Sequence, residues 1–134
     1  MEIRDKLGRG CVWDGRIAPC LHQNHIFAVK VKEKLLNPYY LEYLTASSVG
    51  RTYFDVTAVK TTNLACTSSS KVLAFTIPLP SIEEQNEIVD YLKEKCGCIE
   101  TAISKKEQFI SELENYKKSL IYEYVTGKKE VPES

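Results

Sequence analysis

Cysteine and histidine residues near the N-terminus are the side chains of this sequence best suited to chemistry. Cys11, Cys20, His22 and His25 are of the types that bind zinc, and Cys20 with a histidine could form a thiol–imidazole pair. The spacing of Cys11 and Cys20 does not fit a zinc knuckle, and there is no CxxC pair. No nucleophile turn, phosphate loop or dinucleotide fingerprint accompanies them. The sequence therefore predicts no enzyme active site, no metal site and no cofactor.

The same region offers chemistry of a second kind, which is hydrogen bonding to nucleic acid. Residues 22–25 read His-Gln-Asn-His beside a segment of strand composition. Their side chains carry donors and acceptors of the types that read base edges. The simpler interpretation is that one histidine faces the core and the other faces solvent. The residues alone leave both interpretations open.

Charge is unevenly divided along a chain whose formal net charge is zero. Residues 1–80 hold ten Lys/Arg and six Asp/Glu, an excess of +4, whereas residues 81–134 hold eight and twelve, an excess of −4. A mildly basic N-terminal part is compatible with phosphate contact, although many proteins that never meet DNA carry as much charge.

Composition favours a reduced, cytoplasmic protein of one small domain with an extension. The five cysteines are odd in number and irregularly spaced, which fits free thiols better than a disulfide framework. No apolar run approaches the length of a membrane span, which is about 20 residues.

Residues 1–80 are expected to form a small, β-rich α+β domain. Strand composition predicts strands at Cys11–Trp13, His25–Val31 and Val72–Leu79. A helix should begin at Asn37-Pro38, because proline fits the first helical position. Gly50 should end or interrupt that helix, and a second short helix is possible over residues 52–56.

Residues 81–127 predict one long helix, followed by a polar tail over residues 128–134. Pro78 and Pro80 keep the preceding backbone extended. Ser81 and Glu84 have the spacing of a capping box, in which each side chain accepts a free backbone N–H of the first turn. Gly127 supplies a left-handed stop. Such a helix would be about 70 Å long at 1.5 Å per residue, and Gly97 could mark a bend in it.

The apolar pattern of this helix indicates a partner helix. Leu92, Ile99, Leu113 and Leu120 fall on a seven-residue ladder whose middle position is Lys106. The widened apolar face adds Ala102, Ile103, Phe109, Ile110, Tyr116 and Tyr124. A core helix of a larger globule is the alternative, but the face is longer than any core that 134 residues could build. We therefore expect a coiled-coil-forming helix.

Three segments resemble a known family. Gly8–Trp13 with His22–Phe27 looks like the target recognition domain of type I restriction–modification specificity subunits, and Thr61–Ala65 looks like the loop before its final strand. The segment Ile77-Pro-Leu-Pro-Ser-Ile-Glu-Glu-Gln85 is similar to the family's entry into its spacer helix, and it is the most specific match.

The resemblance implies a non-catalytic subunit that recognises double-stranded DNA. In this family two recognition domains are held apart by an antiparallel pair of long helices, and modification (methyltransferase) and restriction subunits dock on the assembly. This sequence resembles one spacer helix with only the C-terminal half of one recognition domain, so a truncated form is expected. Its helix would pair with itself or with another specificity half.

Two functions follow as hypotheses. The first is DNA recognition, with the candidate DNA-binding residues Arg4, Lys6, Arg9, Arg16, His22, Gln23, Asn24, Lys60, Thr61, Thr62 and Asn63. The second is an assembly module that pairs with a specificity half or a methyltransferase subunit without binding DNA. If the candidate DNA-binding residues lie together on one face of the protein, the first hypothesis is favoured. If they are spread over different faces, the second is favoured.

Overall fold

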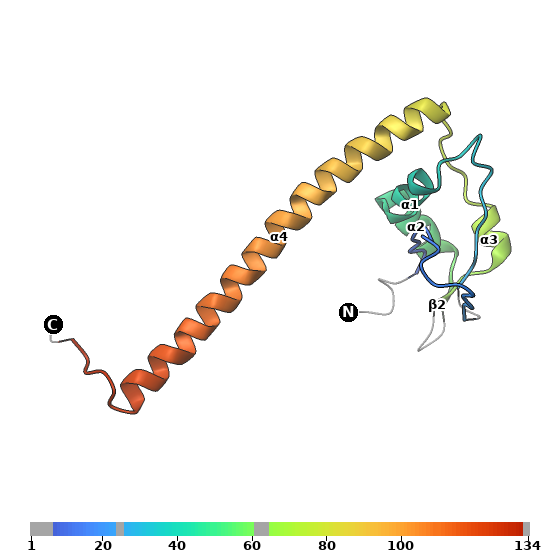
Figure 1. Ribbon diagram of the computed structural model, residues 1–134. Coiled ribbons are helices and arrows are strands. Elements are labelled where there is room, and N and C mark those ends of the chain that lie inside the picture. The colour runs from blue at the N-terminus through green and yellow to red at the C-terminus, as the bar shows by residue number, and fades with distance from the viewer. Residues whose placement is uncertain (1–6, 24–25, 61–64, 133–134) are drawn as a thin grey trace. The chain divides into compact units, whose positions relative to one another are not determined.

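Short helices and one long helix make up most of the chain (Figure 1). The structure is a computed structural model that describes residues 7–23, 26–60 and 65–132. Along these residues the elements are α1 (Pro38–Ala46), α2 (Ser48–Thr57), β1 (Val59–Lys60), β2 (Ala65–Cys66), α3 (Ser69–Leu73) and α4 (Ile82–Val125). The chain divides into two compact units, Met1–Tyr91 and Leu92–Ser134.

The start of α1 follows the sequence prediction. Asn37 is the N-cap, and its side-chain oxygen accepts the backbone N–H of Tyr39 at 2.8 Å. Ser47, rather than Gly50, separates α1 from α2, because its hydroxyl caps α2 by accepting the N–H of Gly50 at 3.3 Å. Gly50 lies inside α2, where an added Cβ would come within 2.4 Å of the Leu44 carbonyl oxygen. This glycine therefore permits a tight α1–α2 corner instead of ending a helix.

The β-rich character expected from the sequence is not found among the described residues. β1 and β2 are two residues each and pair antiparallel, with Val59 opposite Cys66 and Lys60 opposite Ala65. Residues 11–13 and 26–31 are assigned to no strand. Strand composition does not suffice there, since a strand also needs a neighbouring backbone to pair with.

The predicted strand Val72–Leu79 was wrong. Its first residues belong to α3, and the rest is irregular. Ser68 is the N-cap of α3 and accepts the N–H of Lys71 at 3.4 Å. A capped turn thus outweighs the β-propensity of Val72 and its neighbours.

Three aromatic side chains form a cluster at α2. The rings of Tyr53, Phe54 and Phe75 lie 4.9–5.3 Å apart between centroids, and Phe54 is buried. The Tyr53 hydroxyl also donates to the Lys71 carbonyl of α3 at 2.8 Å. Gly8, at φ +70°, packs so closely on Phe54 that an added Cβ would lie 2.4 Å from the ring.

Gln85, in the first turn of α4, is completely buried. Its side-chain nitrogen donates to the carbonyls of Leu35 and Pro80, each at 2.9 Å. Its side-chain oxygen accepts the backbone N–H of Asn37, also at 2.9 Å. One amide thus joins the chain before α1, the chain before α4, and α4 itself. Next to it, Asn37 donates from its side chain to Asn86 at 2.7 Å.

The signals that predicted the start and the end of α4 are both present in the structure. The Ser81 hydroxyl accepts the N–H of Glu84 at 3.2 Å. At the C-terminal end Gly127 has φ +71°. The N–H of Gly127 donates to the Tyr124 carbonyl, and that of Lys128 to the Glu123 carbonyl, which is a Schellman motif. The helix runs through Gly97 without interruption.

Replacing Gln85 should destabilise the first unit more than its size suggests. Gln85→Ala leaves two carbonyls and one N–H without their partner, and a buried unsatisfied group costs about 1–3 kcal/mol. We expect the free energy of unfolding in urea, followed by circular dichroism, to fall by about 3 kcal/mol. The matched control is Gln108→Ala on the same helix, because the Gln108 side chain is exposed and donates to the exposed Glu112 carboxylate. Equal costs for the two variants would contradict this assignment.

The N-terminal cap of α4 gives a second test. Ser81→Ala should reduce stability by about 0.5–2 kcal/mol, since the Glu84 N–H loses its acceptor. A double-mutant cycle with Glu84→Ala measures whether the carboxylate completes a capping box. Strictly additive effects would mean that the hydroxyl caps the helix alone.

Candidate nucleic-acid and partner-helix surfaces

The structure describes four of the candidate DNA-binding side chains, Arg9, Arg16, His22 and Gln23, and all four are exposed. Arg4, Lys6, Asn24, Thr61, Thr62 and Asn63 lie outside the described residues, as does the side chain of Lys60. Exposure makes the four side chains accessible to a ligand, but it does not bring them together on one face.

Arg16 already has an anionic partner. Its guanidinium forms an ion pair with the Asp14 carboxylate, and its backbone N–H donates to the same carboxylate at 3.1 Å. Gly15 between them has φ +74°, so the pair closes a tight turn. A phosphate would have to compete with Asp14 for this cation. Of these two arginines, Arg9 therefore remains the simpler candidate for phosphate contact.

His22 and Gln23 lie in an irregular, exposed segment. The His22 ring nitrogen Nδ1 is 3.3 Å from the Gln23 carbonyl oxygen, and that carbonyl accepts the N–H of Ile26 at 3.0 Å. These bonds use the backbone carbonyl of Gln23, and its amide side chain is exposed. Its donor and acceptor are the pair that can bond an adenine edge bidentately.

The pairing of β1 with β2 brings together the two ends of the segment over residues 61–64. Lys60 is opposite Ala65, directly before and after that segment. Three candidate DNA-binding residues, Thr61, Thr62 and Asn63, fall in this segment, which lies outside the described residues.

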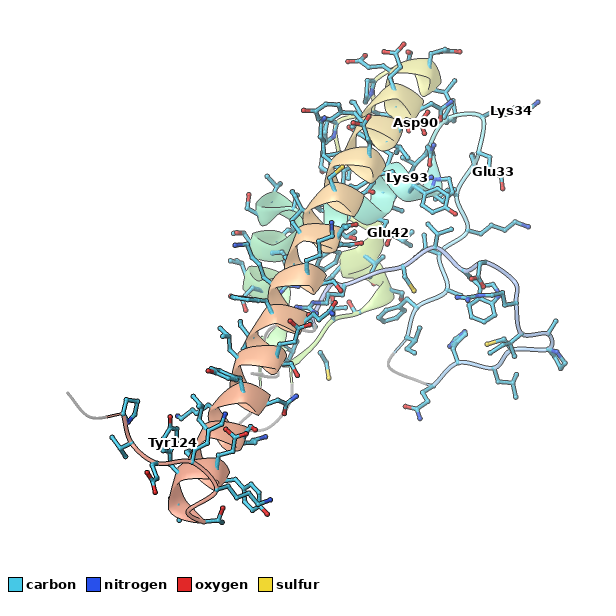
Figure 2. All side chains as sticks on the ribbon, turned by 60° about the vertical axis from the view of Figure 1, so that its left-hand side comes forward. Glu33, Lys34, Glu42, Asp90, Lys93 and Tyr124 are labelled. Carbon is cyan, nitrogen blue, oxygen red and sulfur yellow. The ribbon has the colours of Figure 1, made fainter. Side chains whose placement is uncertain are left out.

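A second candidate surface runs along α4 in the second unit. Ile99, Ile103, Phe109, Ile110, Leu113 and Tyr116 are 49–62% exposed. Leu92 and Leu120 are partly exposed, and Ala102 is exposed. Tyr124, near the C-terminal end of the helix in Figure 2, is 37% exposed. The predicted apolar face is thus present and largely uncovered in this chain.

Charged contacts hold the residues that directly follow α4 at its C-terminal end. Lys129 lies 2.7 Å from a carboxylate oxygen of Glu123, and hydrogen bonding to that carboxylate raises the pKa of Lys129 above 10.5. The Lys128 ammonium lies 4.5 Å from the centre of the Tyr122 ring. These contacts fold the chain after Gly127 back onto the last turn of α4.

Sequence reasoning missed the role of Gln85, which it used only as the last residue of the spacer-entry motif. Glutamine is rarely buried, and two of the three groups that Gln85 bonds lie 48 and 50 residues away along the chain. Its only local signal is the position directly after the capping pair. No residue pattern near Gln85 identifies its distant partners.

The described residues show neither a metal-binding cluster nor a membrane-spanning helix. These residues contain no group of three or more His, Cys, Asp or Glu side chains that could hold a metal ion. All five cysteines are described, and each is a free thiol. Within the described part of the chain, no helix combines the length and the apolar content that crossing a bilayer requires.

Comparison with known proteins identifies the family. The model of the type I restriction modification DNA specificity domain matches residues 15–122, well over half of the chain. A curated relative from Methanocaldococcus jannaschii, named "Putative type I restriction enzyme MjaX specificity subunit", is 24% identical over 94 residues. The alignment covers 70% of this chain but only 22% of the relative. No solved structure matches. Because the family match runs from the N-terminal unit far into α4, this chain belongs to the family of type I restriction–modification DNA specificity domains.

Proposed function

We propose that this chain is a DNA-recognition component of a type I restriction–modification system. Its N-terminal unit supplies part of a target recognition domain, and α4 supplies a spacer helix. The chain catalyses no reaction itself. It acts in the cytoplasm by positioning modification and restriction subunits on double-stranded DNA.

The extent of the family match is the observation that carries this proposal. It spans residues 15–122 and therefore includes both the segment around His22 and the apolar face of α4. A match limited to the helix would have fitted any coiled coil. The curated relative is much longer than the aligned region, which fits a chain corresponding to one part of a specificity subunit.

The uncovered face of α4 supports the helix-pairing role. Burying an aliphatic side chain of leucine size is worth about 1.5–3 kcal/mol. Several such side chains are about half exposed along the helix. A second helix that covered them would therefore gain enough free energy to offset the loss of freedom on association. Family membership points to an antiparallel helix of another specificity half, or of a second copy.

Association through α4 should be measurable with the chain alone. We expect weak self-association at high micromolar concentration in sedimentation experiments. The double variant Ile99→Asp with Leu113→Asp should abolish it, because each change places a charge in the buried seam at a cost above about 1.5–3 kcal/mol.

The matched control for association is Ser104→Asp with Ser111→Asp. It introduces the same residues at exposed positions on the opposite side of the same helix and should leave association unchanged. A monomer at high micromolar concentration with a fully formed helix would contradict the pairing role for the isolated chain.

DNA binding by the chain alone should be weak and salt-dependent. With part of a recognition domain, we expect dissociation constants near the nonspecific range of about 10⁻⁴–10⁻⁶ M. Phosphate contacts should come mainly from Lys6, Arg9, Arg16 and Lys60, and base-edge contacts from Gln23, Asn24 and Asn63. Adding a methyltransferase subunit and a second specificity half should tighten binding and increase its sequence selectivity.

The DNA test is a titration against random duplexes at two salt concentrations. Replacing Lys6, Arg9 and Lys60 with alanine should weaken binding, and each lost phosphate contact should reduce the salt slope by about 0.9. The control replaces Lys93, Lys105 and Lys118 on α4, which removes the same charge. Equal loss in both variants would show that net charge alone attracts DNA.

Two outcomes separate the proposal from its rivals. Nanomolar, sequence-selective binding by this chain alone would show that the chain needs no second specificity half to recognise its target. Loss of all DNA binding together with intact helix association would favour a pure assembly module that binds no DNA.

A further inference from the structure

Three lysines follow one line along the apolar face of α4. Lys95, Lys106 and Lys117 recur every eleven residues. At 3.6 residues per turn, eleven residues make three turns plus about 20°, and the lysines are about 16.5 Å apart along the axis. Each therefore lies within about 20° of the same line, and all three are exposed.

This line runs through the middle of the apolar face rather than along its edge. Lys106 occupies the central position of the ladder that Leu92, Ile99, Leu113 and Leu120 define. On the same helical projection, Ile99 and Leu113 lie about 20° to either side of Lys106. A helix that covers the apolar side chains must therefore also cover the lysines.

No carboxylate shares the line. Between Leu92 and Tyr124 the closest acidic side chain on the projection is Glu114, about 80° away, and the others are about 100° or further. Lys95 forms an exposed pair with Glu94 at 3.1 Å, but Glu94 projects about 120° from the line. The acidic residues of α4 thus lie to either side of its apolar face, and the three lysines lie along the middle of that face.

A second copy of the chain is therefore a poor partner in its fully overlapping registers. In a parallel pair each lysine meets its own equivalent. In an antiparallel pair centred on Lys106, that residue meets its equivalent and Lys95 meets Lys117. Antiparallel pairs centred a few residues away set the lysines against apolar side chains. A charged residue within an apolar seam selects partner and register in this way, at a cost in stability.

We propose that the partner of α4 is a helix of a different chain and not a second copy of α4; this inference rests on the proposed helix-pairing role. That helix has an apolar face of similar length and carries carboxylates near its midline at three-turn spacing, opposite Lys95, Lys106 and Lys117. The carboxylates neutralise the three ammonium groups as the seam loses water. The lysines thus select a non-identical specificity half over a second copy of this chain.

The chain itself provides the acidic probe. The triple variant Lys95→Glu, Lys106→Glu and Lys117→Glu keeps the apolar residues and supplies carboxylates at the required spacing. Sedimentation should show that an equimolar mixture of wild-type and variant chains associates at least tenfold more tightly than either chain alone. The matched control is Lys93→Glu, Lys105→Glu and Lys118→Glu, which changes net charge equally on the outer face. Mixed with wild-type, it should give less than a threefold change.

A single substitution tests the same idea in the opposite direction. Lys106→Leu completes the apolar ladder, so self-association of this variant should be at least tenfold tighter than that of the wild-type chain. Its helix content in circular dichroism should be unchanged or higher.

The possible results discriminate between this inference and the pairing role beneath it. Tighter association of the mixture, together with the gain from Lys106→Leu, supports the inference. Wild-type self-association as tight as that of the mixture overturns lysine selection but leaves helix pairing intact. Failure of every combination to associate, with helices formed, overturns both.

Discussion

The buried side-chain amide of Gln85 is the interaction on which the start of the long helix depends. It bonds the backbone before α1, through Leu35 and Asn37, and the backbone before α4, through Pro80. Asn37 meanwhile caps α1 and bonds Asn86. The starts of α1 and α4 are therefore fastened to the same short stretch of chain. Loss of the Gln85 amide would therefore leave groups at both helix starts without their hydrogen-bond partner.

Beyond its first turns, α4 has a different source of stability. Gln85 and Val89 are buried, whereas the apolar side chains from Ile99 to Tyr116 are about half exposed or more. Local features such as the Ser81 cap and the Schellman motif at Gly127 contribute at the two ends. In most proteins, however, helical stability comes from packing of an apolar face. The middle of α4 lacks that packing in the single chain, which is the physical reason to assign it a partner.

The sequence predicted those parts of the structure that local rules determine. Prolines, a cap and a left-handed glycine lie close to the ends of α4, and the helix Ile82–Val125 is confirmed almost to the residue. Asn37 and Pro38 predicted the start of α1 equally well. The strands failed because pairing is not local. Residues 26–31 have strand composition, yet they are assigned to no strand, and α3 replaces the start of the predicted last strand.

The two candidate surfaces were predictable to different degrees. The apolar face of α4 follows from residue spacing, because a helix converts sequence period directly into a face. The candidate DNA-binding residues are far apart in sequence, so local patterns do not show whether the fold brings them together. Seven of these eleven side chains lie outside the described residues. The role of Gln85 was not predicted for the same reason, since two of its three partners are distant in sequence. Family membership, in contrast, rests on the family match over residues 15–122, and it agrees with the resemblance that the sequence motifs show.

Hydrogen exchange along α4 tests the central claim most directly. The claim is that residues 82–91 are held by the first unit through Gln85, while residues 92–124 are stabilised by a partner helix. In the dilute, monomeric wild-type chain, amides of residues 82–91 should exchange slowly and those of residues 92–124 rapidly. Adding the charge-complementary variant chain should protect residues 92–124 alone. Uniformly slow exchange along the dilute helix, or no added protection on mixing, would contradict the account.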